Sequence, residues 1–351
     1  MMGNAEGGGV QVFITRRIPE PGLALLREAG VSFTICQSRE DDGVSNAQLL
    51  EGTYGCQVLL PLLTEPIDRE VMEINPGLLG IAQMAVGFNN IDIEVATELG
   101  IPVAHTPGVL TETTADLTWA LLMAGARRVP QAHDYMVAGK YKLWGPNLFL
   151  GNDIGTGPDG RRKTLGIIGF GRIGEAVARR ATGFDMDVLA FDPYARETIA
   201  ASELARWADL DELLAASDFV SLHPLLTEET HHLINEERLR KMKPTALLIN
   251  ASRGPVVDEK ALVRALSEGW IGGAALDVYE DEPNMAHGLA ELDNVVLLPH
   301  IASASSDTRG RMATMAAANA VAFLKREKAL DPVNPEVYDT EAYRRRIGAG
   351  G

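Results

Sequence analysis

Short apolar runs of strand length alternate with segments of helical period through the first hundred residues. The runs include VQVFIT, VSFTIC, CQVLLPLL and IPVAHT, and segments such as SNAQLLEGT and IDREVMEIN lie between them. Parallel strands need crossover connections, which are usually helices, so this alternation is typical of a parallel sheet. It predicts a doubly wound α/β unit in this part of the chain.

A second alternation follows. It begins with the apolar run TLGIIGFG and ends with NVVLLPH at His300, and a helix predicted over residues 112–128 connects it to the first. Residues 131–163 lose the periodicity and end in GNDIGTGPDGRRK, which is typical of a loop. A last helix is predicted over residues 307–325. The whole pattern therefore predicts the α/β class, with two doubly wound parallel sheets.

The composition favours a globular protein without nucleic-acid or membrane partners. Of the 351 residues, 46% are hydrophobic, which is enough for two cores. The formal net charge of -16 would repel a phosphate backbone and an anionic membrane. We find no apolar stretch of ~18 residues that could span a membrane and no secretion signal. We therefore expect a cytoplasmic protein, with flexible tails at residues 1–9 and 336–351.

Residues 169–174 read GFGRIG, a G-x-G-x-x-G pattern between an apolar strand and a helix. Here Gly169 would make the tight turn, Gly171 would let the backbone approach a pyrophosphate, and Gly174 would pack helix on strand. The next predicted strand ends in Asp192, where an acid can bind the ribose hydroxyls and repel a 2′-phosphate. The alternatives are an ordinary glycine turn and a strand-end cap. The pattern predicts an NAD(H) site.

Three residues near strand ends of the second alternation could carry acid–base chemistry on a keto acid. Arg253 follows an apolar strand and could bind a carboxylate. His300 ends another strand, and Glu282 lies in the turn EDEP. A carboxylate paired with an imidazole favours the protonated ring and fixes its tautomer, which suits a general acid. Taken singly, each residue could equally be a surface charge or an ordinary strand-end side chain.

The segments around these residues resemble a known family. NASRGPVVDEKALVRAL, AALDVYEDEP and LLPHIASAS are similar, in order and spacing, to the blocks that carry Arg, Glu and His in the D-isomer-specific 2-hydroxyacid dehydrogenases. MAVGFNNIDIEVA, HTPGVLTETTADL and SLHPLLTEETHHLIN resemble plant-type hydroxypyruvate reductases, within the glyoxylate/hydroxypyruvate reductase group, more than the family at large. The resemblance extends over residues 10–335.

The resemblance implies roles for individual residues. Arg253 would bind the substrate carboxylate and keto oxygen, His300 would donate the proton, and Glu282 would hold His300. Other residues would bind the substrate: the N–H groups of Val86 and Gly87, the side chains of Leu62 and Leu63, and Trp144 of a neighbouring subunit. Others would bind NAD(H): Gly169, Gly171, Arg172, Ile173, Gly174, Asp192, Thr114, His223, Thr227, Ala251, Asp277 and Ala302.

The resemblance also implies a domain organisation. A Rossmann NAD-binding domain of residues 109–300 would be inserted in a flavodoxin-like substrate-binding domain of residues 10–108 and 301–335. Residues 131–152 would form an arm that embraces the second subunit of a homodimer. Two departures from many relatives are HPLLT at residues 223–227, where they read H-x-P-L-T, and Ala302 in place of Gly.

The expected function is NADH-dependent reduction of the small 2-keto acids hydroxypyruvate and glyoxylate, giving D-glycerate and glycolate. No histidine spacing suggests a metal site. One alternative is a 3-phosphoglycerate dehydrogenase, whose substrate phosphate needs additional cationic residues. Another, of a different class, is an NADH-sensing binding protein like the transcriptional co-repressors that share this fold. The sequence does not rank hydroxypyruvate against glyoxylate, because the same groups bind both.

Overall fold

The computed structural model describes residues 10–36 and 43–348, and it divides into two compact units. One unit contains the described residues up to Leu110 together with those from Ala304 onward, and the other contains Thr111–Ser303. The chain therefore leaves the first unit, builds the whole of the second, and returns. The resemblance implies that the inserted domain spans residues 109–300.

The first unit is built on a five-stranded sheet with the order β2-β1-β3-β4-β5, in which all strands are parallel. This is the flavodoxin-like order that the sequence predicts. Its strands are β1 (Val12–Ile14), β2 (Phe33–Ile35), β3 (Val58–Leu60), β4 (Gly80–Ala82) and β5 (Val103–Ala104).

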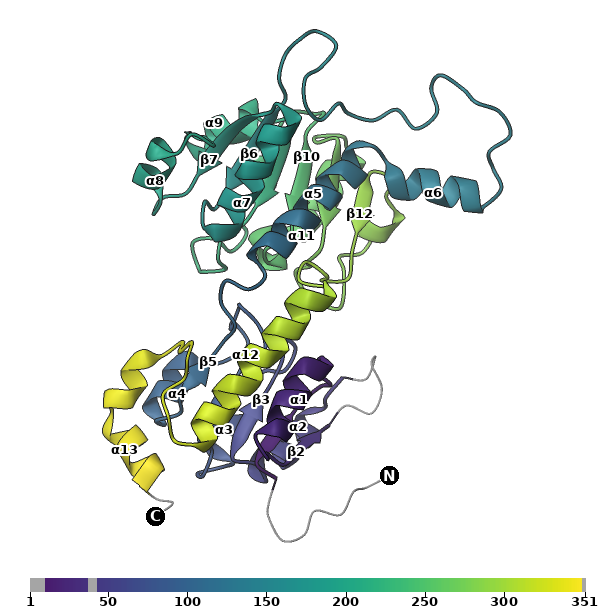
Figure 1. Ribbon diagram of the computed structural model, residues 1–351. Coiled ribbons are helices and arrows are strands. Elements are labelled where there is room, and N and C mark those ends of the chain that lie inside the picture. Colours follow the sequence, from purple (N-terminus) through teal and green to yellow (C-terminus); the bar gives the residue numbers. More distant parts are fainter. Residues whose placement is uncertain (1–9, 37–42, 349–351) are drawn as a thin grey trace. The chain divides into compact units, whose positions relative to one another are not determined.

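Helices cover this sheet, and polar side chains cap the N-termini of several of them. Ser45 and Gln48 form a capping box at the start of α2, and Asp68 and Asp92 cap the next two helices. The long helix α12 packs beside α1 and against β3 and β4 (Figure 1). The helices are α1 (Glu20–Glu28), α2 (Asn46–Tyr54), α3 (Arg69–Glu73), α4 (Ile93–Glu98), α12 (Ser306–Leu324), η4 (Pro335–Asp339) and α13 (Glu341–Gly348).

The second unit is built on a seven-stranded parallel sheet with the order β12-β11-β10-β9-β6-β7-β8. The strand order reverses at β6, between β9 and β7, as in a Rossmann fold. Both sheets thus confirm the predicted α/β class. The strands are β6 (Thr164–Ile168), β7 (Asp187–Phe191), β8 (Arg206–Trp207), β9 (Phe219–Leu222), β10 (Leu247–Asn250), β11 (Gly273–Leu276) and β12 (Val295–Leu297).

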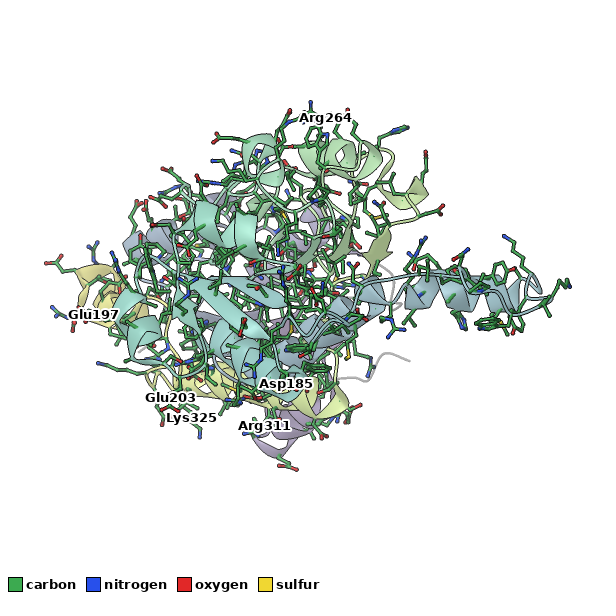
Figure 2. All side chains as sticks on the ribbon, turned by 90° about the horizontal axis from the view of Figure 1, so that it is seen from above. Asp185, Glu197, Glu203, Arg264, Arg311 and Lys325 are labelled. Carbon is green, nitrogen blue, oxygen red and sulfur yellow. The ribbon has the colours of Figure 1, made fainter. Side chains whose placement is uncertain are left out.

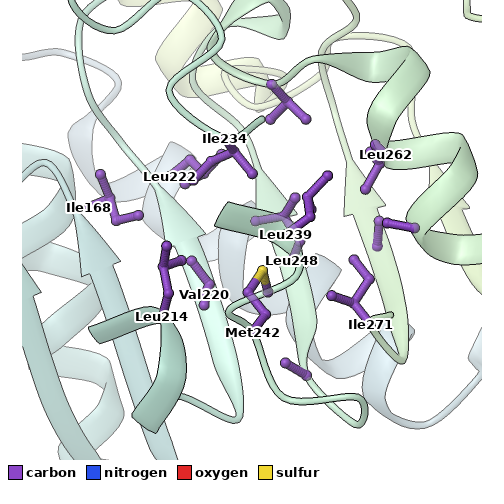
Figure 3. Packing of buried hydrophobic residues seen from close by; sticks show 14 of the residues in the cluster. Ile168, Leu214, Val220, Leu222, Ile234, Leu239, Met242, Leu248, Leu262 and Ile271 are labelled. Carbon is purple, nitrogen blue, oxygen red and sulfur yellow. The ribbon is translucent and has the colours of Figure 1, made fainter. Parts of the chain in front are cut away.

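Apolar side chains project from both faces of the seven-stranded sheet. Figure 3 shows one face, where Val220, Leu222 and Leu248 meet Leu214, Leu239 and Leu262 from the covering helices. The other face packs against α5 and α7 around Trp119 and Ile167. Burial on two sides explains the nearly continuous apolar runs of the sequence. The helices are α5 (Thr111–Ala126), α6 (Val129–Val137), α7 (Arg172–Ala181), η1 (Thr182–Phe184), α8 (Arg196–Ala201), α9 (Leu210–Ala216), α10 (Glu236–Leu239), η2 (Gly254–Val256), α11 (Glu259–Ser267) and η3 (Leu289–Glu291).

The prediction of a flexible tail over residues 336–351 is wrong for residues 336–348. Val337, Tyr338 and Tyr343 are buried there and form a small core of their own. Arg346 donates hydrogen bonds to the carbonyls of Leu99, Pro76 and Leu78, which anchors α13 to the first unit. The high charge of this segment concealed its apolar contacts. Residues 1–9 and 349–351, the rest of the predicted tails, lie outside the described residues.

The predicted loop over residues 131–163 is only partly a loop, because α6 occupies its beginning. After α6 the chain follows an extended path without helix or strand until β6. Figures 1 and 2 show α6 and the first part of this path projecting away from the seven-stranded sheet as an arm, and at Asn152 the chain is back at α5, because the Asn152 N–H donates to the Ala126 carbonyl. Several of its large apolar side chains are exposed: Val129, Met136, Val137, Tyr141, Leu143, Trp144, Leu148 and Leu150.

Among the described helices, none combines the length and the apolar character that a membrane crossing requires. Residues 10–36 and 43–348 contain no group of three His, Cys, Asp or Glu side chains arranged to hold a metal ion.

Candidate functional site

The glycine turn joins β6 to α7 and leaves its backbone open on one side. Gly169 has φ +89°, and a Cβ there would lie 2.6 Å from the His223 carbonyl carbon. A Cβ on Gly174 would lie 2.1 Å from the Gly169 carbonyl oxygen, so the helix approaches the turn too closely for a side chain. Gly171 has no atom within 4 Å of such a position and begins α7 without a capping side chain. The helix N-terminus therefore offers its N–H groups to an anion.

Asp192 follows β7 directly and fixes the glycine turn. One carboxylate oxygen accepts a hydrogen bond from the Phe170 N–H and the other from the Tyr194 N–H, both at 2.9 Å. Each oxygen retains capacity for a second hydrogen bond. Asp192 can therefore hold the turn and bind ribose hydroxyls at the same time. The first of these roles is one that the sequence did not predict.

The second unit also contains a buried hydroxyl that lacks a partner. Thr114, in the first turn of α5, is 3% exposed, and its Oγ1 has no hydrogen-bond partner among the described residues. Buried hydroxyls are normally satisfied, so an orphan next to a loop connection is a candidate ligand contact. Together with the glycine turn and Asp192, this hydroxyl fits a bound dinucleotide.

The remaining predicted cofactor residues lie at the carboxyl ends of strands or at the start of α7. Arg172 and Ile173 open α7, Arg172 being exposed. The imidazole of His223, after β9, contacts the Ser221 hydroxyl at 2.9 Å, and burial lowers its pKa to about 4, so it is neutral near pH 7. Thr227 is exposed and donates its hydroxyl hydrogen bond to Glu229. Ala251 is buried at the end of β10.

The structure brings Glu282 and His300 together. His300 Nδ1 and Glu282 Oε2 are 2.8 Å apart, and the second oxygen of Glu282 accepts a hydrogen bond from the Tyr279 N–H at 3.1 Å. Both side chains are about one third exposed. Burial raises the pKa of Glu282, but hydrogen bonds from His300 and Tyr279 and the charges of His300 and Arg253 hold it below its ordinary value.

The backbone of His300 is left-handed, with φ 54°, which is uncommon for a residue other than glycine. Asp277 maintains this conformation. Its carbonyl accepts from the His300 N–H, and its carboxylate oxygens accept from the N–H groups of Ile301 at 2.8 Å and Ala302 at 2.7 Å. Asp277 is fully buried, and burial raises its pKa. The resemblance implies that Asp277 binds NAD(H), whereas its hydrogen bonds here are with the His300 segment.

Arg253 lies directly before η2 and carries a positive charge without a carboxylate partner. Its Nη1 donates to the Ser252 carbonyl at 2.7 Å, and no carboxylate of the described residues lies within ion-pair distance. Burial lowers its pKa, and the negative charge of Glu282 opposes this effect. A partly buried, unpaired guanidinium is suited to bind a carboxylate of a ligand.

The first unit contains the other predicted substrate residues. No described residue accepts a hydrogen bond from the N–H groups of Val86 and Gly87. Leu62 donates its N–H to the buried carboxylate of Glu65, and Leu63 is partly exposed. Asn90 donates to the carbonyls of Leu62 and Glu65 and accepts from Gln83, which also donates to the Gly87 carbonyl.

Trp144 lies on the arm, with 71% of its surface exposed. It makes no hydrogen bond or ring contact within the part of the chain that the structure describes.

Sequence reasoning missed Gln83, Asn90 and Glu259, which position loops. A polar residue inside an apolar run was the only available signal for Gln83.

We predict that the contribution of Glu282 to stability depends on pH. Its pKa is lower in the folded than in the unfolded chain, so the ionised carboxylate stabilises the fold above the ordinary carboxyl range. This contribution is lost as the pH falls through the lowered pKa. The difference in Tm between the wild type and Glu282→Gln should therefore shrink between about pH 7 and about pH 3. Calorimetry at several pH values tests this, and a constant difference contradicts it.

Comparisons with known proteins identify the family of the chain. Residues 119–302 match the family described as D-isomer specific 2-hydroxyacid dehydrogenase, NAD binding domain. A glyoxylate reductase of Korarchaeum cryptofilum is 51% identical over 329 residues, which are 93% of this chain and 96% of the relative.

Two solved structures extend the likeness to the whole fold. A protein of Thermus thermophilus matches with a TM-score of 0.84 at 44% identity and covers 92% of this chain and 99% of its own. An NADPH-dependent glyoxylate/hydroxypyruvate reductase of Sinorhizobium meliloti, in complex with NADP and malonate, matches with a TM-score of 0.76 at 31% identity, over 93% of this chain and 97% of its own. The chain belongs to the D-isomer-specific 2-hydroxyacid dehydrogenase family and is an NAD-dependent oxidoreductase.

Proposed function

We propose that the protein reduces glyoxylate and hydroxypyruvate with NADH. The observation that carries this proposal is the hydrogen-bonded Glu282–His300 pair, together with the partly buried guanidinium of Arg253, which forms no ion pair with a carboxylate of the described residues. Arg253 can bind the carboxylate of a substrate, His300 can donate a proton, and Glu282 can stabilise His300. The names of the relatives support the substrate class.

In the proposed mechanism each residue has one role. Arg253 binds the substrate carboxylate and keto oxygen and polarises the carbonyl. When NADH is bound, its nicotinamide supplies a hydride to the keto carbon. His300 donates a proton to the oxygen, which thereby becomes the hydroxyl of the product. Glu282 remains ionised, as its lowered pKa favours, and stabilises the charged imidazole.

The resemblance also implies substrate contacts at residues of the first unit. The unpartnered N–H groups of Val86 and Gly87 are suited to bind a carboxylate, and Leu62 and Leu63 would supply an apolar wall. The second unit would bind the cofactor through the glycine turn, Asp192 and Thr114, with the nicotinamide carboxamide near Ala251 and Asp277. Activity in the cytoplasm stays a prediction from the sequence.

The decisive experiment is NADH consumption by the purified protein with glyoxylate, hydroxypyruvate, phosphohydroxypyruvate and pyruvate. Rapid turnover of either of the first two supports the proposal. Preference for phosphohydroxypyruvate would instead indicate a 3-phosphoglycerate dehydrogenase. NADH binding without turnover of any of the four would favour the co-repressor-like alternative.

We further propose that NADH is preferred to NADPH. The carboxylate of Asp192 would accept hydrogen bonds from ribose hydroxyls and repel a 2′-phosphate. Asp192→Asn keeps the shape of the side chain but removes the charge, so the ratio of kcat/KM for NADH over NADPH should fall about tenfold or more. Glu203→Gln, at an exposed acid in the same unit (Figure 2), is the control. An unchanged ratio excludes Asp192 from the ribose site.

We also propose that the arm mediates a homodimer. Leu143 is 84% exposed and Trp144 71%, and contiguous exposed apolar groups of this kind mark interaction sites. The double variant Leu143→Ser/Trp144→Ser should shift the protein from dimer to monomer in light scattering, while far-UV circular dichroism stays unchanged. A monomeric wild type, or a variant that remains dimeric, contradicts the proposal.

A further inference from the structure

We propose that Glu259 is a positioning residue for catalysis, whose carboxylate fixes the loop of residues 279–286 that carries Glu282. This inference rests on the proposed roles of Glu282 and His300. Glu259 is the first residue of α11 and is only 4% exposed. An acid at the first turn of a helix is normally solvated, so its burial calls for partners on another element.

The partners of Glu259 lie at both ends of the loop. One carboxylate oxygen accepts a hydrogen bond from the Glu280 N–H and the other from the Ala286 N–H, both at 2.8 Å. One side chain thus bridges two backbone sites on either side of Glu282. Hydrogen bonds to a buried carboxylate are stronger than those between neutral groups, so this bridge restrains the whole turn.

A second acid completes the arrangement from the opposite side. Glu280 accepts a hydrogen bond from the Glu259 N–H at 3.1 Å, and its other oxygen lies 2.8 Å from His232 Nε2. The carboxylate of each glutamate therefore accepts a hydrogen bond from the backbone N–H of the other. His232 is itself anchored, because its N–H donates to the Pro255 carbonyl and its ring stacks on His231.

The loop held in this way contacts all three proposed catalytic residues or their immediate neighbours. The Tyr279 N–H donates to Glu282, and the Tyr279 hydroxyl donates to the Leu298 carbonyl, two residues before His300. The backbone of Tyr279 also packs on Gly254, which is next to Arg253. The approach is so close that a Cβ on Gly254 would lie 1.7 Å from the Tyr279 carbonyl oxygen. Movement of the loop would therefore displace Glu282 relative to both His300 and Arg253.

The test uses the full-length protein with Glu259→Gln. The amide nitrogen replaces one acceptor, so one of the two loop N–H groups loses its partner. We expect kcat to fall about tenfold to 100-fold, because small misplacements of catalytic groups have effects of this size. The dissociation constant of NADH, measured by fluorescence, should stay unchanged.

The pH profile distinguishes positioning from mere stability. Glu282→Gln removes the carboxylate that lies 2.8 Å from His300 Nδ1, so the pH profile of kcat/KM should differ from that of the wild type. Glu259→Gln should change the pH profile in the same sense as Glu282→Gln, by a smaller amount. Arg253, His300 and Asp277 also interact electrostatically with Glu282, and all three remain in both variants.

A double variant adds an independent readout. If Glu259 acts through Glu282, then Glu259→Gln/Glu282→Gln should have a kcat/KM within about twofold of Glu282→Gln alone. Glu259→Asp keeps the charge but is too short to reach both N–H groups, and it should reproduce the kinetic effect if Glu259→Gln folds poorly. Glu203→Gln, at an exposed acid, is the matched control.

The outcomes separate this inference from the proposed function. A lower Tm with an unchanged pH profile, or effects of the two substitutions that multiply, would overturn the positioning role while leaving the catalytic residues in place. Turnover like the wild type in Glu282→Gln and in a His300 variant would overturn the proposed mechanism itself.

Discussion

Replacing His300 by Asn should reduce kcat by about 10²–10⁴-fold, the usual contribution of a general acid. Asn is the informative substitution because it tolerates the left-handed backbone that His300 adopts, with φ 54°. Loss of activity would then report the missing imidazole and not a distorted chain. Kinetics with saturating NADH and keto acid measure the effect.

Two controls belong to this experiment. NADH binding, followed by fluorescence, should be unchanged, since the glycine turn and Asp192 are distant in sequence and hydrogen-bonded to other groups. His287→Asn changes an exposed histidine of the same unit and should retain full activity. A kcat like that of the wild type in His300→Asn would exclude the histidine as the proton donor.

Arg253→Met should lower kcat/KM for the keto acid by roughly 10²–10³-fold. Removing one member of a buried, hydrogen-bonded charge pair costs about 2–5 kcal/mol, and the carboxylate of the substrate would lose such a partner. Met keeps much of the length and the apolar stem. Arg253→Lys restores the charge but not the two-pronged geometry, so it should recover only part of the loss.

The comparison with a surface arginine makes the result specific. Arg311 is exposed on α12 (Figure 2), and Arg311→Met should leave kcat/KM unchanged. Arg253→Met should keep the far-UV circular dichroism of the wild type, because the guanidinium forms no ion pair within the described residues and donates its hydrogen bond to the adjacent Ser252 carbonyl. If Arg253→Met neither raises KM nor lowers kcat, the arginine does not bind the substrate.

The sequence predicted the two sheets well because parallel strands buried on both faces produce long apolar runs. It predicted the pairing of Glu282 and His300 from a family resemblance, since the two residues lie on separate elements and no local pattern links them. The glycine turn was accessible directly, because its spacing reflects steric requirements at Gly169 and Gly174.

Other features depend on tertiary contacts that a linear pattern does not carry. The helix α13 looks like a charged tail, yet Tyr343 and Arg346 tie it to the first unit. Glu259 is the first helical residue after the cap Asp258, where an acid is expected for the helix dipole alone. Only the fold reveals that its carboxylate instead binds the backbone of the loop at Glu280.

The return of the chain to its first unit has a consequence for synthesis in the cell. Helix α12 supplies Met312, Ala316 and Phe323 to the core above β3 and β4. A ribosome releases the chain from its N-terminus, and domains generally fold as units. The contiguous Thr111–Ser303 unit can therefore fold first, while β1 to β5 must wait, with one apolar face uncovered, until α12 emerges. During this interval the uncovered apolar face favours aggregation of the nascent chain.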